Sequence, residues 1–328
     1  MTTILNEVHR MDEQKYNLYQ SLAELDKLFD LSAKEIDKTA CEDLAEKARI
    51  IYEQYPESED IALRYAGILV NLSVVQVNVK ELSNTTNSIK QIFEQFQHSE
   101  DIALHYTMAL VNLSVEQVNV EERKNTANLV KEIFEQFQHS EDIALRYAMV
   151  LFNLSKLQNE RDEVGNTVKQ ILAILTNLSS VKIFEIVVKI FENNPDTPLD
   201  TNDIPFTSLT KILDKLCFYS NDGFDRKLLI RALNLDLVIN TKYDILKDWI
   251  KHYKDDENKL NQLIDIYRIV QEIKYQLGLK AKDKNSNLKF GHYTKGKTLQ
   301  NLLDQDTGNT DDTKFSVSGC RYRRNIGT

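Results

Sequence analysis

Cysteine, proline and glycine are scarce in this chain, which has 3 Cys, 4 Pro and 9 Gly among 328 residues. Proteins built of many β-turns need more Gly and Pro, so the scarcity argues against an all-β protein and favours long helices with short connections. Cys41, Cys217 and Cys320 lie far apart and show neither a disulfide framework nor the paired spacing of a zinc site. We therefore expect a mostly helical protein from a reducing compartment.

Long apolar runs are missing as well. No segment approaches ~18 uninterrupted apolar residues, which is roughly the length that crosses a bilayer. Residues 1–7 do not combine a basic stretch with a following apolar one, as a secretion signal does. The sequence predicts a cytoplasmic protein without membrane insertion.

Signatures of catalysis and of metal binding are also lacking. The six histidines show no His-x-x-x-His or Cys/His spacing, and no Gly-rich phosphate loop or Gly-x-Ser-x-Gly elbow is present. Paired carboxylates such as Glu59-Asp60 are expected at solvated helix starts. We therefore expect a non-enzymatic protein with no catalytic residue, no metal site and no cofactor.

What the chain does contain is a repeat with a period of 41 residues. The eight residues from Ser58 to Tyr65 return at positions 99–106 with one change, and unchanged at positions 140–147. The seven residues 92–98 likewise recur unchanged at 133–139. A period of this size is typical of a solenoid, in which each repeat buries its apolar face against its neighbours.

Each complete repeat reads as two antiparallel helices, here called helix A and helix B. Helix A is expected to begin at Ser58, Ser99 or Ser140, because a serine hydroxyl can accept a hydrogen bond from the free amides of the first turn. Helix B of the first complete repeat is predicted over about residues 84–97 from its apolar spacing. Residues 74–79 between them form either an extended linker or the end of helix A, and the sequence leaves both open.

The repeat and the prolines divide the chain into five parts. We expect an N-terminal segment (1–15), the repeats (16–194), a proline-bearing linker (195–205), a second helical region (206–277) and a basic tail (278–328). Ten Lys and Arg against five Asp give the tail a charge of +5, although the whole chain carries −9. The predicted fold class is all-α, a right-handed α-solenoid of helix-turn-helix repeats followed by a helical bundle and a short irregular tail. With the period held at 41, Val181 takes the place of Ser140 in the next helix.

The junction of the first two repeats resembles that of tetratricopeptide repeats. Its motif is Ala-x-x-x-Tyr-x-x-Tyr-Pro-x-Ser from Ala48 to Ser58, followed by Tyr65-Ala66, and the resemblance covers roughly residues 16–180. That family has a period of about 34 residues, so the extra residues must lengthen the helices or their loop. HEAT-like repeats are closer in length and remain the structural alternative. In these families helix A or its counterpart lines an inner groove, where asparagines often hold a bound peptide.

A polar stripe on helix A is the candidate binding surface. Positions 60, 64 and 71 fall on one side of a helix, since seven residues are nearly two turns of about 3.6 residues each. An asparagine amide offers both donor and acceptor to a peptide unit. The predicted protein- or peptide-binding residues are Asp60, Arg64, Asn71, Asp101, His105, Asn112, Asp142, Arg146 and Asn153. The alternative is that Asp60 and Arg64 form a surface pair and that Asn71 satisfies the backbone at the end of its own helix.

The function expected from these observations is a scaffold or adaptor that binds a protein segment. Nucleic acid is expected at most weakly, through the basic tail, because the body is acidic. In that tail His292-Tyr293-Thr294 resembles the opening of an uncharacterised bacterial domain and, loosely, ADP-ribosyltransferase-like folds. The alternative function is therefore a regulatory repeat module of a sensor or effector, whose C-terminal domain is truncated or supplied by a partner. The sequence leaves the oligomeric state open.

Overall fold

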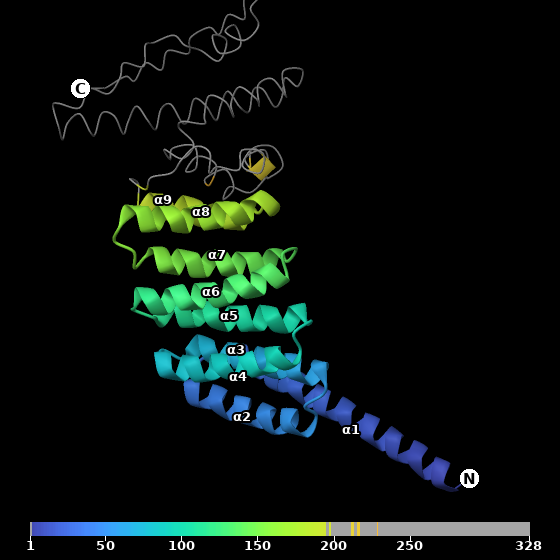
Figure 1. The fold of residues 1–328 in the computed structure, drawn as a ribbon. Coiled ribbons are helices and arrows are strands. Elements are labelled where there is room, and N and C mark those ends of the chain that lie inside the picture. The colour runs from blue at the N-terminus through green and yellow to red at the C-terminus, as the bar shows by residue number, and fades with distance from the viewer. Residues whose placement is uncertain (1, 195–196, 198–210, 213–214, 217–227, 229–328) are drawn as a thin grey trace, which may run out of the picture. The chain divides into compact units, whose positions relative to one another are not determined.

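The computed structural model describes residues 2–194, 197, 211–212, 215–216 and 228, with side chains from residue 16 onward (Figure 1). The chain divides into two compact units, residues 1–212 and 213–328, and the account below concerns the first. Except for single positions, the predicted linker, second helical region and tail lie outside the described residues.

The described residues form nine helices and no strand, which confirms the all-α repeat fold (Figure 1). The first helix runs through residue 16 without a break, so residues 2–15 are its first half. The helices are α1 (Thr2–Ser32), α2 (Lys38–Gln54), α3 (Glu59–Val75), α4 (Val79–Gln95), α5 (Glu100–Glu116), α6 (Val120–Gln136), α7 (Glu141–Ser155), α8 (Arg161–Asn177) and α9 (Val181–Asn193).

The odd-numbered helices are the A helices and the even-numbered ones the B helices. Each A helix from α3 to α7 packs on the A helices before and after it, on its own B helix and on the B helix of the preceding repeat. Such a helix is apolar around most of its circumference, and Ile61, Ala62 and Ile68 of α3 are each 0% exposed. Neighbouring repeats therefore bury one another's apolar faces, as the period predicted.

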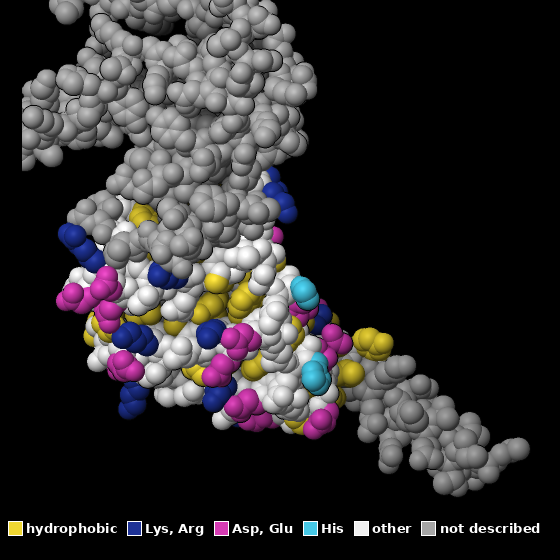
Figure 2. All heavy atoms as spheres, turned by 45° about the horizontal axis from the view of Figure 1, so that its top comes forward, with side chains coloured by type: hydrophobic (Ala, Val, Ile, Leu, Met, Phe, Trp, Pro, Cys, Tyr) yellow, Lys and Arg dark blue, Asp and Glu magenta, His cyan; other side chains and the backbone are white. Residues whose placement is uncertain are grey.

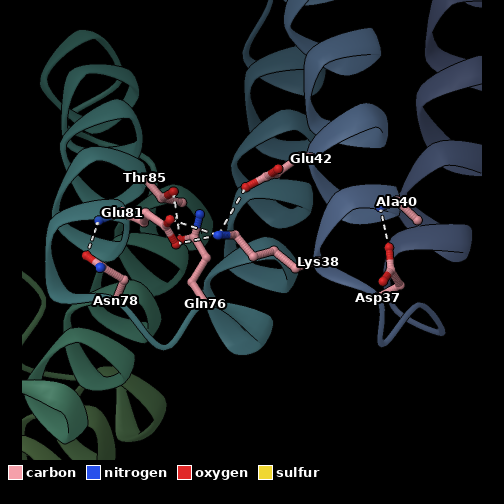
Figure 3. A network of polar contacts seen from close by, with 8 residues as sticks. All are labelled: Asp37, Lys38, Ala40, Glu42, Gln76, Asn78, Glu81 and Thr85. Carbon is pink, nitrogen blue, oxygen red and sulfur yellow. Dashed lines mark hydrogen bonds and ion pairs between the residues drawn. The ribbon is translucent and has the colours of Figure 1, made fainter.

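The B helix of the first complete repeat begins earlier than the sequence indicated. Helix α4 starts at Val79 rather than near residue 84, so residues 74 and 75 end α3 and only residues 76–78 connect the two helices. Its cap is Asn78, whose side chain accepts hydrogen bonds from the amides of Lys80 and Glu81. Figure 3 shows Asn78 beside Glu81. The corresponding residues Asp37 and Asn119 cap α2 and α6 in the same way. Capping by a side-chain oxygen fixes the start of the helix even where the first turn carries few apolar residues.

The expected serine caps occupy the right positions but differ in their bonds. Ser140 accepts a hydrogen bond from the amide of Ile143 at 3.4 Å, whereas the hydroxyls of Ser58 and Ser99 make no such bond. Ser180 caps α9 like Ser140 caps α7, with the amide of Ile183 at 3.4 Å. The interval from Ser140 to Ser180 is 180 − 140 = 40 residues, so placing Val181 at the cap was wrong. The turn before α9 is one residue shorter than in the other repeats.

Two sets of side-chain contacts recur with the period of 41 residues. Rings of B helices pack on the tyrosine of the following A helix, and threonine hydroxyls of B helices donate to a buried glutamine that follows the preceding A helix. The ring pairs are Tyr52–Tyr65, Phe93–Tyr106 and Phe134–Tyr147, with centroids 5.1, 5.7 and 5.9 Å apart. The hydroxyl–amide pairs are Thr85–Gln76, Thr126–Gln117 and Thr167–Gln158, at 3.0, 3.0 and 2.9 Å. Figure 3 shows the Thr85–Gln76 pair beside the ion pair of Lys38 and Glu81.

Candidate functional site

Four positions along each A helix form what we call the A-helix stripe. In α3 they are Asp60, Arg64, Gly67 and Asn71, spaced by four, three and four residues so that they stay on one side of the helix. The equivalent residues are Tyr19, Ala23, Asp26 and Asp30 in α1, Asp101, His105, Met108 and Asn112 in α5, and Asp142, Arg146, Met149 and Asn153 in α7. Sequence reasoning missed the third position because aspartate, glycine and methionine there share no chemistry.

The first stripe position of α3, α5 and α7 is an exposed aspartate in the first turn of the helix, namely Asp60, Asp101 and Asp142. The helix dipole favours a negative charge at this end of a helix. Asp60 Oδ1 lies 3.9 Å from Nη1 of Arg64, a distance at which an exposed pair contributes little to folding. These carboxylates are therefore free to contact a partner.

The three stripe asparagines join successive A helices. Nδ2 of Asn71, Asn112 and Asn153 donates to the hydroxyl of a serine 39 residues earlier in the chain. The pairs are Asn71–Ser32, Asn112–Ser73 and Asn153–Ser114, at 2.9, 2.8 and 2.9 Å. The serines in turn donate to the carbonyls of Phe29, Val70 and Val111 in their own helices, at 2.8, 2.6 and 2.7 Å. This bond between repeats is a role that neither sequence interpretation included, although the sequence Val-Asn-Leu-Ser at 70–73 and 111–114 contains both kinds of partner.

Arg64 links α3 to α1 through a carboxylate. Its Nε donates to Oδ1 of Asp26 at 2.5 Å and its Nη1 to the carbonyl of Asp60 at 2.9 Å. The side chain of Arg64 is 29% exposed, so part of the guanidinium is shielded from water while its charge is balanced by Asp26. In this repeat the stripe cation already has an acidic partner.

Arg146 occupies the same position in α7 without such a partner. Its Nε is buried and has no hydrogen-bond partner among the described residues. Its Nη1 contacts Sδ of Met149 at 3.6 Å, and a thioether sulfur is only a weak acceptor. The residue that corresponds to Asp26 in this repeat is Met108. The stripe cation of α7 is therefore held in place by its own helix but is not neutralised.

His105 is the stripe residue of α5 between these two arginines. A Cβ atom added to Gly67 would lie 3.3 Å from Nε2 of His105 and 2.7 Å from Cε2 of Phe29. Because Gly67 has no side chain, Phe29 of α1 and His105 of α5 can approach each other across α3. Burial lowers the pKa of His105, while the charge and the carbonyl of Asp101 oppose this effect in part. His105 is therefore neutral at neutral pH.

Arg123 of α6 is a buried cation that sequence reasoning missed, because its equivalents Leu82 and Val164 are apolar core residues. Its guanidinium donates to the carbonyls of Val115, at 3.0 Å, and Asn153. It thereby satisfies carbonyls at the C-terminal ends of α5 and α7, where the helix dipole also favours a cation.

Lys156, the C-terminal cap of α7, adds a second positive charge near Arg123. Its Nζ donates to Oδ1 of Asn153 at 3.3 Å and lies 4.2 Å from the centre of the Phe152 ring. Burial first, and then the charges of Arg123 and Lys189, lower the pKa of Lys156. The C-terminal end of the stripe in α7 is therefore positively charged.

In Figure 2 acidic and basic side chains are interspersed on the visible face, with apolar side chains between them. Among the residues that the structure describes, no three His, Cys, Asp or Glu side chains gather closely enough to hold a metal ion. None of the described helices combines the length and the apolar character needed to cross a membrane.

No protein-family model, no curated protein and no solved structure matches the chain. Function is therefore inferred from the residues themselves.

Proposed function

We propose that the protein is a helical-repeat scaffold that binds a segment of another protein along the A-helix stripe. The observation that carries this proposal is the regular return of Asp, Arg or His, and Asn on successive A helices that pack directly on one another. A segment lying across α3, α5 and α7 meets the same kinds of group once per repeat. Periodic binding groups on stacked helices are how solenoid proteins recognise extended partners.

The hydrogen bonds between repeats support this proposal. The Asn–Ser bonds fix the spacing of adjacent A helices, so the stripe is ordered before a partner arrives. Each asparagine uses one donor of its amide in this bond, whereas the amide has two donors and an oxygen acceptor. Asn71 and Asn112 are half-buried and can offer these further groups to a peptide unit, but Asn153 is 6% exposed and serves mainly the stack. Preorganisation reduces the entropy lost on binding.

The repeats themselves are proposed to be of the tetratricopeptide-like class. The packing of the motif residues at the first junction supports this proposal, since Ala48 is 0% exposed and the Tyr52 ring lies 5.1 Å from that of Tyr65 across the repeat boundary. A cytoplasmic location remains part of this proposal.

The proposal is tested by finding where a bound segment lies. Random dodecapeptides displayed on phage are selected on the purified protein, and the selected peptides are then photocrosslinked to variants that carry benzoylphenylalanine at Asp101 or Asp142. Both positions are exposed on the stripe, so the crosslinker should not disturb the core. We expect crosslinks at these positions.

The matched control places the same crosslinker at Asn125 or Glu132, which are equally exposed but lie on the B helix α6. Peptides that crosslink only from α6, or a selection that yields no binding peptide, would contradict the proposal.

A further inference from the structure

The stripe residues Arg64, His105 and Arg146 differ in what stands opposite them. The same position in successive repeats, 41 residues apart, holds Asp26, Gly67 and Met108. Asp26 lies 38 positions before Arg64, in the preceding A helix. Gly67 and Met108 lie 38 positions before His105 and Arg146 in the same way. The carboxylate that pairs with the first cation is thus replaced by glycine and then by methionine.

This replacement leaves Arg146 without a carboxylate partner among the described residues. A guanidinium is always charged and prefers a carboxylate in bidentate or single hydrogen bonds. In the described part of the chain no carboxylate oxygen lies within 4.0 Å of its nitrogens, and its Nε is buried without a partner. Arg64 shows which group fits, because the same side chain in the same position takes a carboxylate from the neighbouring helix at 2.5 Å.

We infer that the segment bound by the stripe is acidic, and that one of its carboxylates pairs with Arg146 as Asp26 pairs with Arg64. This inference rests on the proposed function and names the chemistry of the partner. Met149 contacts the guanidinium, and Met108 holds the position equivalent to Asp26 in the preceding A helix. Methionine side chains are flexible and polarisable, so they can adapt to an incoming group and contact an apolar neighbour of the acidic residue.

The surrounding charges favour the same partner at one end of the helix. Lys156 and Lys189 stand near the C-terminal end of α7, although Lys189 also pairs with Glu185 at 2.8 Å. Asp101 and Asp142 at the N-terminal ends of α5 and α7 repel an anion. The acidic residue of the partner is therefore expected on the side of Arg146 that faces the C-terminal end of α7.

The experiment uses the selected dodecapeptides and a set of charge variants of the full chain. We expect Asp and Glu to be enriched among the peptides, and Arg146→Met to weaken their binding about tenfold or more, because a charge-assisted bond is lost. The acidic residues of a peptide are then changed to their amides one at a time. Only the change at the residue that meets Arg146 should weaken binding to the same extent.

Met108→Asp is the decisive variant. It gives α5 the carboxylate that α1 has, so an internal partner should occupy Arg146 and acidic peptides should be excluded without loss of melting temperature. Asn125→Asp, which adds the same charge on the exposed side of α6, should leave peptide binding unchanged. Asp26→Met should free Arg64 and raise the number of peptides bound per chain.

The outcomes separate the two proposals. Peptides without acidic residues that still crosslink from Asp101 or Asp142 would overturn the acidic partner and leave the scaffold function standing. The inference would likewise be wrong if acidic peptides bound Arg146→Met and Met108→Asp as tightly as the parent. A selection without binders would overturn both proposals. Circular dichroism of each variant shows that it is folded before its affinity is compared.

Discussion

The buried contacts between repeats and the exposed stripe beside them follow different rules. The ring pairs, the Thr–Gln bonds and the Asn–Ser bonds are copied from repeat to repeat with nearly the same geometry. The third position of the stripe instead changes from aspartate in α1 to glycine in α3 and methionine in α5 and α7. The copied buried contacts hold the stack together, and the varying third position distinguishes one part of the stripe from the next.

Removing one whole period is the strongest test of the copied contacts. Deleting residues 99–139 brings Tyr147 opposite Phe93 and Asn153 opposite Ser73, so each broken contact is replaced by its equivalent. We expect a shorter, folded protein with a cooperative melt in circular dichroism.

Deleting only residues 99–118 provides the comparison. It removes α5, which packs on α3, α4, α6 and α7, and puts no equivalent helix in its place. This variant should lose most of its helical signal, and equal loss of structure in both deletions would refute the solenoid.

The next largest effect is expected from the ring pairs. Phe134 is 8% exposed and stacks on Tyr147, so Phe134→Ala should cost about 3–5 kcal/mol of unfolding free energy. Phe93→Ala removes a half-buried ring from the same contact one repeat earlier and should cost somewhat less. Thermal or chemical denaturation measures both.

Gln136→Ala serves as the control on the same helix. Gln136 is exposed, and its Nε2 donates to the carbonyl of Gln97 at 2.6 Å. The loss of this solvent-exposed bond should cost about 1 kcal/mol or less. If Gln136→Ala destabilised the protein as much as Phe134→Ala, the face assigned to the core of α6 would be wrong.

The Asn–Ser bonds should each contribute less than a ring pair. Ser73 is 2% exposed, and its hydroxyl links Asn112 to the carbonyl of Val70. Ser73→Ala and Asn112→Ala should each cost about 1–2 kcal/mol, because either change leaves a polar partner unpaired in the stack. The double variant should cost less than the sum, since both single changes break the same bond.

Asp101→Ala is a suitable comparison, as it changes an exposed stripe residue of the same helix as Asn112. Its effect on stability should stay within about 0.5 kcal/mol. Strict additivity of Ser73→Ala and Asn112→Ala would show that the asparagine does not act through the serine.

The exact recurrence of residues made the stack and its period predictable. Sequence copies of Ser58 and Asn71 located helix A and the ends of the repeats, because the same residues in the same order bury the same surface. The shortened turn before Ser180 and the early start of α4 at Val79 escaped prediction. A single missing residue leaves the apolar pattern almost unchanged, and a cap such as Asn78 has no periodic signal of its own.

The stripe was predictable only in part. Helical spacing placed Asp60, Arg64 and Asn71 on one side of α3, but it did not show that Asn71 reaches Ser32 or that Arg64 reaches Asp26. Those bonds depend on the offset between neighbouring A helices, which no residue type encodes by itself. The pairing between repeats at 38 and 39 residues becomes visible only when the helices are placed side by side.

The smallest expected effect concerns His105, the stripe residue between the two arginines. Burial against Gly67 and Phe29 lowers its pKa below the ordinary value of 6.5, with Asp101 opposing the shift. Below about pH 6.5 the unfolded chain therefore binds a proton that the folded protein accepts only at lower pH, so this group makes stability fall as the pH decreases.

His105→Gln removes that proton and keeps a polar side chain of similar reach. The unfolding free energy of the parent should therefore drop more than that of His105→Gln between about pH 7.5 and about pH 5.5, measured by chemical denaturation. His139→Gln is the control, because it makes the same replacement at a histidine that is exposed in the turn before α7. The effect is the smallest of the four because a single side chain titrates and Asp101 offsets part of its shift. A parent and a His105→Gln variant with parallel pH profiles would mean that His105 is solvated in the free protein, and the close approach of α1 and α5 over Gly67 would then need another explanation.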